Sequence, residues 1–440
     1  MNTGRLFFIL VVCIALLSSE SVAGESEMIP LRIDHDELRS FEGLDISDLN
    51  VADVDYALPS GEVVKLKHYT FRFFSQRFME EDWYHKASLF VPAELASEAK
   101  GKLFLASHVV NQSKFREALY GGYGKSTAAV LGIASLVFEP NPVNREFFKR
   151  TGLTKESEWQ DETFERFRKT GDVNEVSFAG IMKANWRAWA AAEKVLGTRF
   201  DQVILGGGSK GGPSVRTMQR HDHRVLSVVV SGSFPFATKE YLAQYGPKPH
   251  ELFMGEQIGF FPELYTDSSF FINVGTNDFG AHPTGVRKFY DTLKGDVRIY
   301  THPNEGHQAR KSEQIQSMQL WLAHKFYGVS LPDIRLKKPE VGDEKVVFVC
   351  EIADSDGVET VELSYSVFED KPFRKYGPHS KAKWKTVAME SIGNSFSVSV
   401  PVQDLAQLHY TARARVVKGR VAGYLSSPVY IVKESLEASK

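Results

Sequence analysis

Short apolar segments alternate with helix-length segments between residues 102 and 326, and this alternation limits the possible folds more than any other feature. The apolar segments span residues 102–106, 133–138, 202–205, 225–230, 270–274 and 297–300. Runs of this kind are typical of strands buried on both faces of a parallel sheet. The helix-length segments span residues 116–131, 178–196, 285–293 and 313–326. Repeated β-α units with short connections predict a doubly wound, mostly parallel sheet with right-handed crossovers.

The pattern changes on both sides of this α/β part. Two segments rich in β-branched and aromatic residues, 63–74 and 87–91, precede it and read as strands. Beyond Leu331 and Pro332 no helix of comparable strength follows. Strand-like segments there span residues 345–352, 358–367, 384–387, 396–400, 408–417 and 429–432. This spacing predicts a small β-sandwich of the immunoglobulin-like type at residues 331–436, with a tail at 437–440.

The N-terminal segment is typical of a secretory signal peptide. Arg5 precedes an apolar run from Leu6 to Leu17, and small residues follow as far as Gly24. The run is too short to span a bilayer by itself. We expect cleavage after Ala23 and a secreted or periplasmic protein, with an uncleaved anchor as the alternative. The expected division is therefore a signal peptide at 1–23, an α/β domain at 24–330 with a short lid at about 231–269, and the sandwich.

Charge and cysteine content exclude several classes of protein. The chain has 53 Lys and Arg against 55 Asp and Glu, a formal net charge of −2, so it lacks the basic excess of a nucleic-acid or anionic-membrane binder. Cys13 and Cys350 are its two cysteines, and Cys13 would leave with the signal peptide. Neither a disulfide framework nor a cysteine-built metal site can form from them. We expect no cofactor and no metal.

One strand of the predicted sheet runs into a glycine cluster that contains a serine. Residues Gly207 to Gly211 (GGSKG) fit the pattern G-x-S-x-G, and a helix is expected to begin near Pro213. In α/β-hydrolases this strand-turn-helix lifts a nucleophilic serine clear of the sheet. The glycines are required because the neighbouring backbone comes too close for side chains. Ser209 is therefore the candidate nucleophile, and the alternative is a glycine-rich helix start with a serine N-cap.

A nucleophilic serine needs a base, and the base needs an acid to orient it. In the hydrolase order both follow the serine, each on the turn after a later strand. Asp278 lies just past the strand at 270–274, and His307 lies past the strand at 297–300. We therefore predict the triad Ser209, Asp278 and His307. His302 is the rival base, because it lies at the end of the strand that precedes His307.

The oxyanion hole is expected to use two backbone amides. The first belongs to Lys210, the residue after the nucleophile. The second comes from the loop after the strand at 102–106, where Val109 is the expected donor and His108 the alternative.

These turns resemble those of the PhoPQ-activated pathogenicity-related protein family, which are secreted α/β-hydrolase-like proteins. The likeness rests on the elbow at Gly207 to Gly212, the turn from Gly275 to Asp278 and the turn from Pro303 to His307. A tryptophan-containing helix before the elbow and a C-terminal β-domain that contains Trp384 are also similar. Where the family usually has Ser-Lys-Arg-Gly-Trp, this chain has SKGGP at 209–213. The resemblance implies a serine hydrolase scaffold and supplies no substrate.

The sequence therefore predicts an exported hydrolase that cleaves a small ester or a peptide through an acyl-enzyme. An ester is favoured because the segment from Ser231 to Ser269 is short and offers only a small lid. A secreted aminopeptidase is an alternative, since the SKGG run also looks like the elbow of secreted serine tripeptidyl aminopeptidases. The other alternative is a catalytically silent binding or signalling protein, in which the C-terminal domain would take a glycan or protein ligand.

Overall fold

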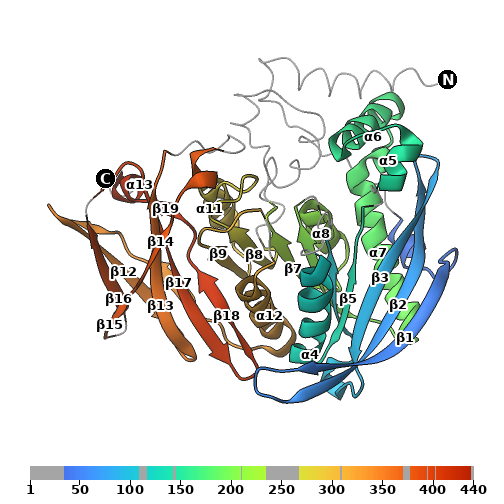
Figure 1. The fold of residues 1–440 in the computed structure, drawn as a ribbon, viewed down its shortest axis with the longest axis horizontal. Helices are drawn as coiled ribbons and strands as arrows, with labels where there is room; N and C mark the ends of the chain where they lie inside the picture. Colours follow the sequence, from blue (N-terminus) through green and yellow to red (C-terminus); the bar gives the residue numbers. More distant parts are fainter. Residues whose placement is uncertain are drawn as a thin grey trace.

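The computed structural model describes residues 34–108, 116–141, 145–209, 211–233, 267–307, 310–369, 377–393, 395–401 and 403–437 (Figure 1). The expected signal peptide lies outside the described residues, as does most of the expected lid. In the part of the chain that is described, no helix combines the length and the apolar character that a membrane crossing requires.

A 14-stranded mixed sheet forms the centre of the molecule, with the order β1-β2-β3-β5-β4-β6-β7-β8-β9-β18-β17-β13-β14 and β19 paired to β17. Its middle is parallel, as predicted, from β5 to β9. These parallel strands are β4 (Lys102–Ser107), β5 (Ala134–Phe138), β6 (Gln202–Gly208), β7 (Val225–Ser231), β8 (Phe270–Gly275) and β9 (Val297–His302). Three antiparallel strands extend the sheet beyond β5, namely β1 (Ile46–Ala57), β2 (Val63–Phe78) and β3 (Glu81–Pro92).

Helices cover both faces of the parallel strands, because successive residues of a buried strand point to opposite faces. On β6, Val203 and Leu205 belong to one hydrophobic core and Ile204 to another. The first core is covered by α7 (Ser177–Leu196), α8 (Gly211–His221) and α11 (Pro283–Thr292). The second is covered by η2 (Ala118–Ser126), α4 (Thr127–Leu131) and α12 (Ser312–Tyr327). This two-sided cover is the doubly wound arrangement that the sequence predicts.

Several smaller elements surround this core. They are α2 (His35–Arg39), η1 (Ser97–Ala99), α5 (Arg145–Thr151), α6 (Glu156–Thr170) and η3 (Val173–Glu175). Neither α6 nor the edge strand β1 is predicted from the sequence pattern. In Figure 1, α5 and α6 lie together at one end of the sheet.

The C-terminal region is rich in strands, as predicted. Its elements are β10 (Asp333–Leu336), β11 (Glu340–Val341), β12 (Lys345–Ala353), β13 (Val358–Val367), η5 (Pro378–Lys381), β14 (Lys385–Ala388), β15 (Glu390–Ile392), β16 (Ser395–Pro401), β17 (Leu408–Lys418), β18 (Val421–Ser426), β19 (Tyr430–Ile431) and α13 (Val432–Glu437). A separate five-stranded sheet, β10-β12-β16-β15 with β11 beside β12, packs against β13 and β17 over a third apolar core.

The C-terminal strands also join the central sheet. Strand β18 pairs antiparallel with β9, where Ser426 faces Ile299. The Ser426 hydroxyl accepts a hydrogen bond from the Thr301 amide at 2.9 Å. Helix α12 packs over the join, because the Tyr424 amide donates to the Ser317 hydroxyl at 2.8 Å. In Figure 1 the red and orange strands therefore continue the sheet that the blue strands begin.

Candidate active site

Ser209 lies on a sharp turn between the end of β6 and the start of α8. Its φ of +49° is left-handed, a conformation that residues other than glycine rarely adopt and that clusters at functional sites. The turn is fixed at both ends. The Ser209 amide donates to the Ser231 carbonyl at 2.9 Å, and the Gly212 amide donates to the Ser209 carbonyl at 3.1 Å.

Neighbouring groups leave no space for side chains at the glycines that flank Ser209. A Cβ atom on Gly207 would lie 2.5 Å from the Gly211 carbonyl oxygen. A Cβ on Gly208 would overlap the imidazole of His108. The sequence therefore needs glycine at these positions to let strand, turn and helix come together.

Asp278 and His307 lie on the turns after β8 and β9, at the same edge of the sheet as Ser209. His307 Nδ1 donates to Asp278 Oδ1 at 2.7 Å. His307 Nε2 lies 2.8 Å from Ser209 Oγ. Because Nδ1 carries the proton in this arrangement, Nε2 of the neutral ring is free to accept the serine proton. The structure thus brings the three predicted residues into one hydrogen-bonded chain.

The Asp278 carboxylate is held from several sides and is fully buried. Its Oδ1 also accepts hydrogen bonds from the amides of Gly280 and Ala281, at 2.7 and 3.1 Å. Among the described residues, no partner approaches Oδ2 within hydrogen-bond distance. Gly232 closes over this side with a φ of +56°, and a Cβ there would lie 2.9 Å from Oδ2.

Aromatic rings border this chain of hydrogen bonds. The ring of Phe279 packs on His307 with centroids 4.5 Å apart. On the other side of the elbow, His108 stands edge-on to Tyr123 at 4.9 Å. Burial lowers the pKa of His108 to about 4, so its imidazole is neutral at pH 7. Burial raises the pKa of the Tyr123 phenol, which keeps this side of the site uncharged.

The rival base lies elsewhere. His302 donates from Nδ1 to the Pro303 carbonyl at 3.0 Å, and its Nε2 lies 3.2 Å from the Glu313 carboxylate. The hydrogen bond from His302 is the main cause that lowers the pKa of Glu313 to about 2. His302 is therefore engaged with helix α12, and the structure does not bring it to Ser209. The two expected oxyanion donors, Lys210 and Val109, lie outside the described residues.

The C-terminal region reaches the turns that carry Asp278 and His307, a contact that the sequence does not predict. Nε2 of His379 donates to the main-chain carbonyl of Asp278 at 2.9 Å. The side chain of Asn304, on the turn before His307, exchanges two hydrogen bonds with the backbone of Trp384. The available signal in the sequence is the turn from Pro303 to His307, which contains Asn304 and belongs to the family resemblance.

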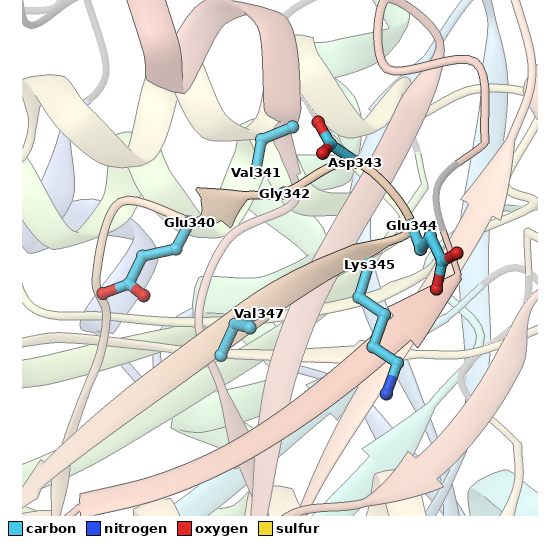
Figure 2. A pocket seen from close by; sticks show the side chains of 7 residues that line it. All are labelled: Glu340, Val341, Gly342, Asp343, Glu344, Lys345 and Val347. Atoms are coloured by element: carbon cyan, nitrogen blue, oxygen red, sulfur yellow. The ribbon is translucent and has the colours of Figure 1, made fainter.

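A second place that could hold a ligand lies in the C-terminal region. A shallow pocket lies around the turn between β11 and β12, and Figure 2 shows the side chains that line it. None of these residues belongs to the turns that carry Ser209, Asp278 and His307. Within the described ranges, no group of three His, Cys, Asp or Glu side chains is arranged to hold a metal ion. Trp384, the tryptophan of the C-terminal region, is buried and packs on Phe368 with ring centroids 6.0 Å apart, so it offers no exposed ring to a ligand.

Comparison with known proteins tests the resemblance. The model of the PhoPQ-activated pathogenicity-related protein family matches residues 52–236. This match bears out the resemblance to the family over residues 52–236. The matched segment contains the elbow with Ser209, whereas Asp278 and His307 lie beyond its end. No curated protein matches the chain.

Solved structures of α/β-hydrolases are similar at low identity. An acetyl xylan esterase from Paenibacillus sp. R4 has 13% identity and a TM-score of 0.39, over 62% of this chain and 87% of its own. Acetyl xylan esterase 1 from Thermoanaerobacterium sp. JW/SL YS485 has 15% identity and a TM-score of 0.40, over 68% and 96%. An S-formylglutathione hydrolase from Agrobacterium tumefaciens has 14% identity and a TM-score of 0.41, over 64% and 99%.

Proposed function

We propose that the protein is an exported serine hydrolase that cleaves a small ester through an acyl-enzyme. The observation that carries this proposal is the continuous hydrogen-bonded chain from Ser209 through His307 to the buried Asp278. The strained left-handed turn at Ser209 supports it independently, because a serine that merely capped a helix would have extended backbone angles.

The proposed reaction follows from these positions. Ser209 Oγ attacks the substrate carbonyl carbon while His307 Nε2 takes the hydroxyl proton. Asp278 stabilises the imidazolium that forms, and the amides of Lys210 and Val109 are proposed to bind the oxyanion. The tetrahedral intermediate then expels the alcohol, which takes the proton from His307 as the acyl-enzyme forms. Water, activated by the same histidine, releases the acid and restores the serine.

An ester is proposed over a peptide because the sequence has room for only a small lid over the site. The segment from Ser231 to Ser269 is too short for a large helical insertion over the site. The apolar border of the site is compatible with a small acyl group, because Phe279 packs directly on His307. Export is proposed from the N-terminal 23 residues, which have the three regions of a signal peptide.

We also propose that residues 24–330 and 331–436 act as two units, the second an immunoglobulin-like sandwich. The separate apolar core between β12 and β13 supports this division. Burial of Trp384 argues against its use as a surface for glycans. Another role for the C-terminal unit is suggested by η5, because His379 in η5 contacts the turn that carries Asp278.

Labelling with a fluorophosphonate probe tests the nucleophile. The wild type is expected to be labelled, and Ser209→Ala is expected to lose all labelling with an unchanged melting temperature. Ser214→Ala is the matched control, because Ser214 is a buried serine on α8, the helix after the turn that carries Ser209, with no place in the hydrogen-bonded chain. A wild type that is never labelled would favour the silent binding protein, and labelling that survives in Ser209→Ala would exclude Ser209.

Hydrolysis of acyl esters of graded chain length, beside aminoacyl amides, then tests the substrate class. Faster turnover of short-chain esters is the expected result. Turnover of aminoacyl amides alone would replace the esterase by an aminopeptidase.

A further inference from the structure

The segment that contains η5, residues 377–384, lies between β13 and β14 and contacts both turns that carry the base and the acid. We call it the η5 segment. On the acid turn it contacts Asn277 and Asp278, and on the histidine turn it contacts Asn304. The two turns come from β8 and β9, whereas the η5 segment is 70 or more residues further along the chain. A single C-terminal segment thus holds two catalytic turns of the α/β part.

His379 makes the contact nearest to the chemistry. It is 1% exposed, and its Nε2 donates to the main-chain carbonyl of Asp278. The carbonyl can only accept, so the ring carries its proton on Nε2. Burial lowers the pKa of His379, which keeps this neutral form at neutral pH. The ring also stands edge-on to His282 with centroids 4.3 Å apart. His282 lies between the acid turn and α11, so His379 contacts the chain both at that turn and just after it.

Asn304 and Asn277 complete the contact. The Asn304 side chain donates to the Trp384 carbonyl at 2.9 Å and accepts from the Trp384 amide at 2.8 Å. Asn277 donates to the Ala382 carbonyl at 2.6 Å. In these bonds, side chains of the catalytic turns contact backbone groups of the η5 segment. The bonds therefore depend on where the backbone of the η5 segment lies and little on which side chains it carries. They fix each turn relative to the other through one common partner.

We propose that the η5 segment is a positioning element of the active site, with His379 as its principal positioning residue. This inference rests on the proposed function, because it concerns the Asp278–His307 pair. His379 touches neither the substrate nor the reacting atoms. By binding the Asp278 main chain it fixes where the carboxylate stands, and the carboxylate fixes the imidazole. The η5 segment therefore contributes to the active site from the C-terminal region.

A substitution that keeps the ring and removes the donor separates this role from packing. In His379→Phe the Asp278 carbonyl loses its donor from the η5 segment and keeps only the longer bond from the Ala281 amide, at 3.4 Å. The kcat is expected to fall by about 10-fold to 100-fold, because small displacements of catalytic groups have effects of that size. The KM is expected to stay within about twofold, since His379 is not at the substrate. His379→Gln returns an N–H donor near the position of Nε2 and is expected to recover most of the lost kcat.

Ser364→Ala serves as the matched control. Ser364 bonds Thr386 at 2.9 Å between β13 and β14, so its loss disturbs the same part of the C-terminal region without a contact to the catalytic turns. We expect its kcat to equal that of the wild type. The assay is steady-state hydrolysis of a p-nitrophenyl ester, with the rate of fluorophosphonate labelling as a second measure and thermal unfolding measured on each variant.

The outcomes distinguish this inference from the proposed function. An inactive, unlabelled wild type contradicts the proposed function itself. An active wild type with an unchanged kcat in His379→Phe overturns the positioning role. Equal losses of kcat in His379→Phe and His379→Gln overturn the positioning role as well, because they would indicate that His379 acts only by packing. If His379→Phe does not fold, Asn304→Gly decides, since Asn304 is exposed and glycine accepts its φ of +59°. A wild-type kcat in that variant overturns the proposal.

Discussion

Gly232 offers the sharpest test of how closely the acid and the base are packed. The residue follows β7 and faces the Asp278–His307 pair with a left-handed backbone. In Gly232→Ala the new Cβ would lie 2.9 Å from Asp278 Oδ2 and 3.3 Å from His307 Nδ1. Ordinary contact begins at 3.4 Å, so the carboxylate must move by 3.4 − 2.9 = 0.5 Å or more.

This movement acts on the 2.7 Å hydrogen bond between Asp278 and His307. A displacement of about 1 Å can cost about 100-fold in rate, so we expect a fall in kcat on the order of 10-fold. An alanine with left-handed backbone also destabilises the fold by about 1–2 kcal/mol. Both effects should appear together, a slower enzyme and a melting temperature lower by a few degrees.

Gly197 separates the two effects. It ends α7 with a φ of +64°, and nothing lies within 4 Å of a Cβ built there. Gly197→Ala therefore carries the same backbone penalty without a clash and should lose stability while keeping kcat. The assay compares kcat for a p-nitrophenyl ester with thermal unfolding in both variants. If the two alanine variants have the same kcat, close packing against the acid does not govern the reaction.

Three further predictions concern stability and reactivity. Burial lowers the pKa of His85, His108 and His409 from the ordinary 6.5 to about 4. Because the unfolded chain takes up these protons first, stability should be complete above pH 6.5 and fall between pH 6.5 and 4, by up to roughly 3 kcal/mol for each histidine, which urea unfolding at pH 7 and 5 can measure. Burial also raises the pKa of Cys350 to about 12, so iodoacetamide should modify it, as followed by peptide mapping, only after denaturation. Glu193→Ala should destabilise the fold by about 3 kcal/mol in the same urea assay, because this buried carboxylate accepts from an indole N–H and a backbone amide.

The sequence could assign Ser209, Asp278 and His307 to one candidate site for a topological reason. The carboxyl ends of parallel strands meet at one edge of the sheet, so residues just past β6, β8 and β9 had to come close together. The apolar runs that mark these strands are unambiguous because the strands are buried on both faces. Choosing His307 over His302 needed the turn as well as the strand end, since His302 is the last residue of β9 and His307 lies on the turn after it.

The elements that were missed have weak or local signals. Strand β1 is an edge strand that is exposed for most of its length and interrupted by aspartates, so it has no clear alternation. Helix α6 is rich in charged residues, and few of its described side chains, Trp159 among them, are buried in the protein. The contacts of His379 and Asn304 depend on where the C-terminal sheet attaches to β9. No local pattern encodes a join between segments that are more than a hundred residues apart.

That join has a consequence for the synthesis of the protein. Ile299 and Tyr300 on β9 are buried in the finished molecule, and β18 covers the free edge of this strand. While the nascent chain emerges, β9 is made long before β18, so the backbone groups on the edge of β9 that faces away from β8 have no β18 to pair with in the interval. Such an open apolar edge is a template for association with other chains. The parallel core therefore remains prone to aggregation until the last strands are made. Pairing of β18 with β9, once the C-terminus is released, removes the open edge.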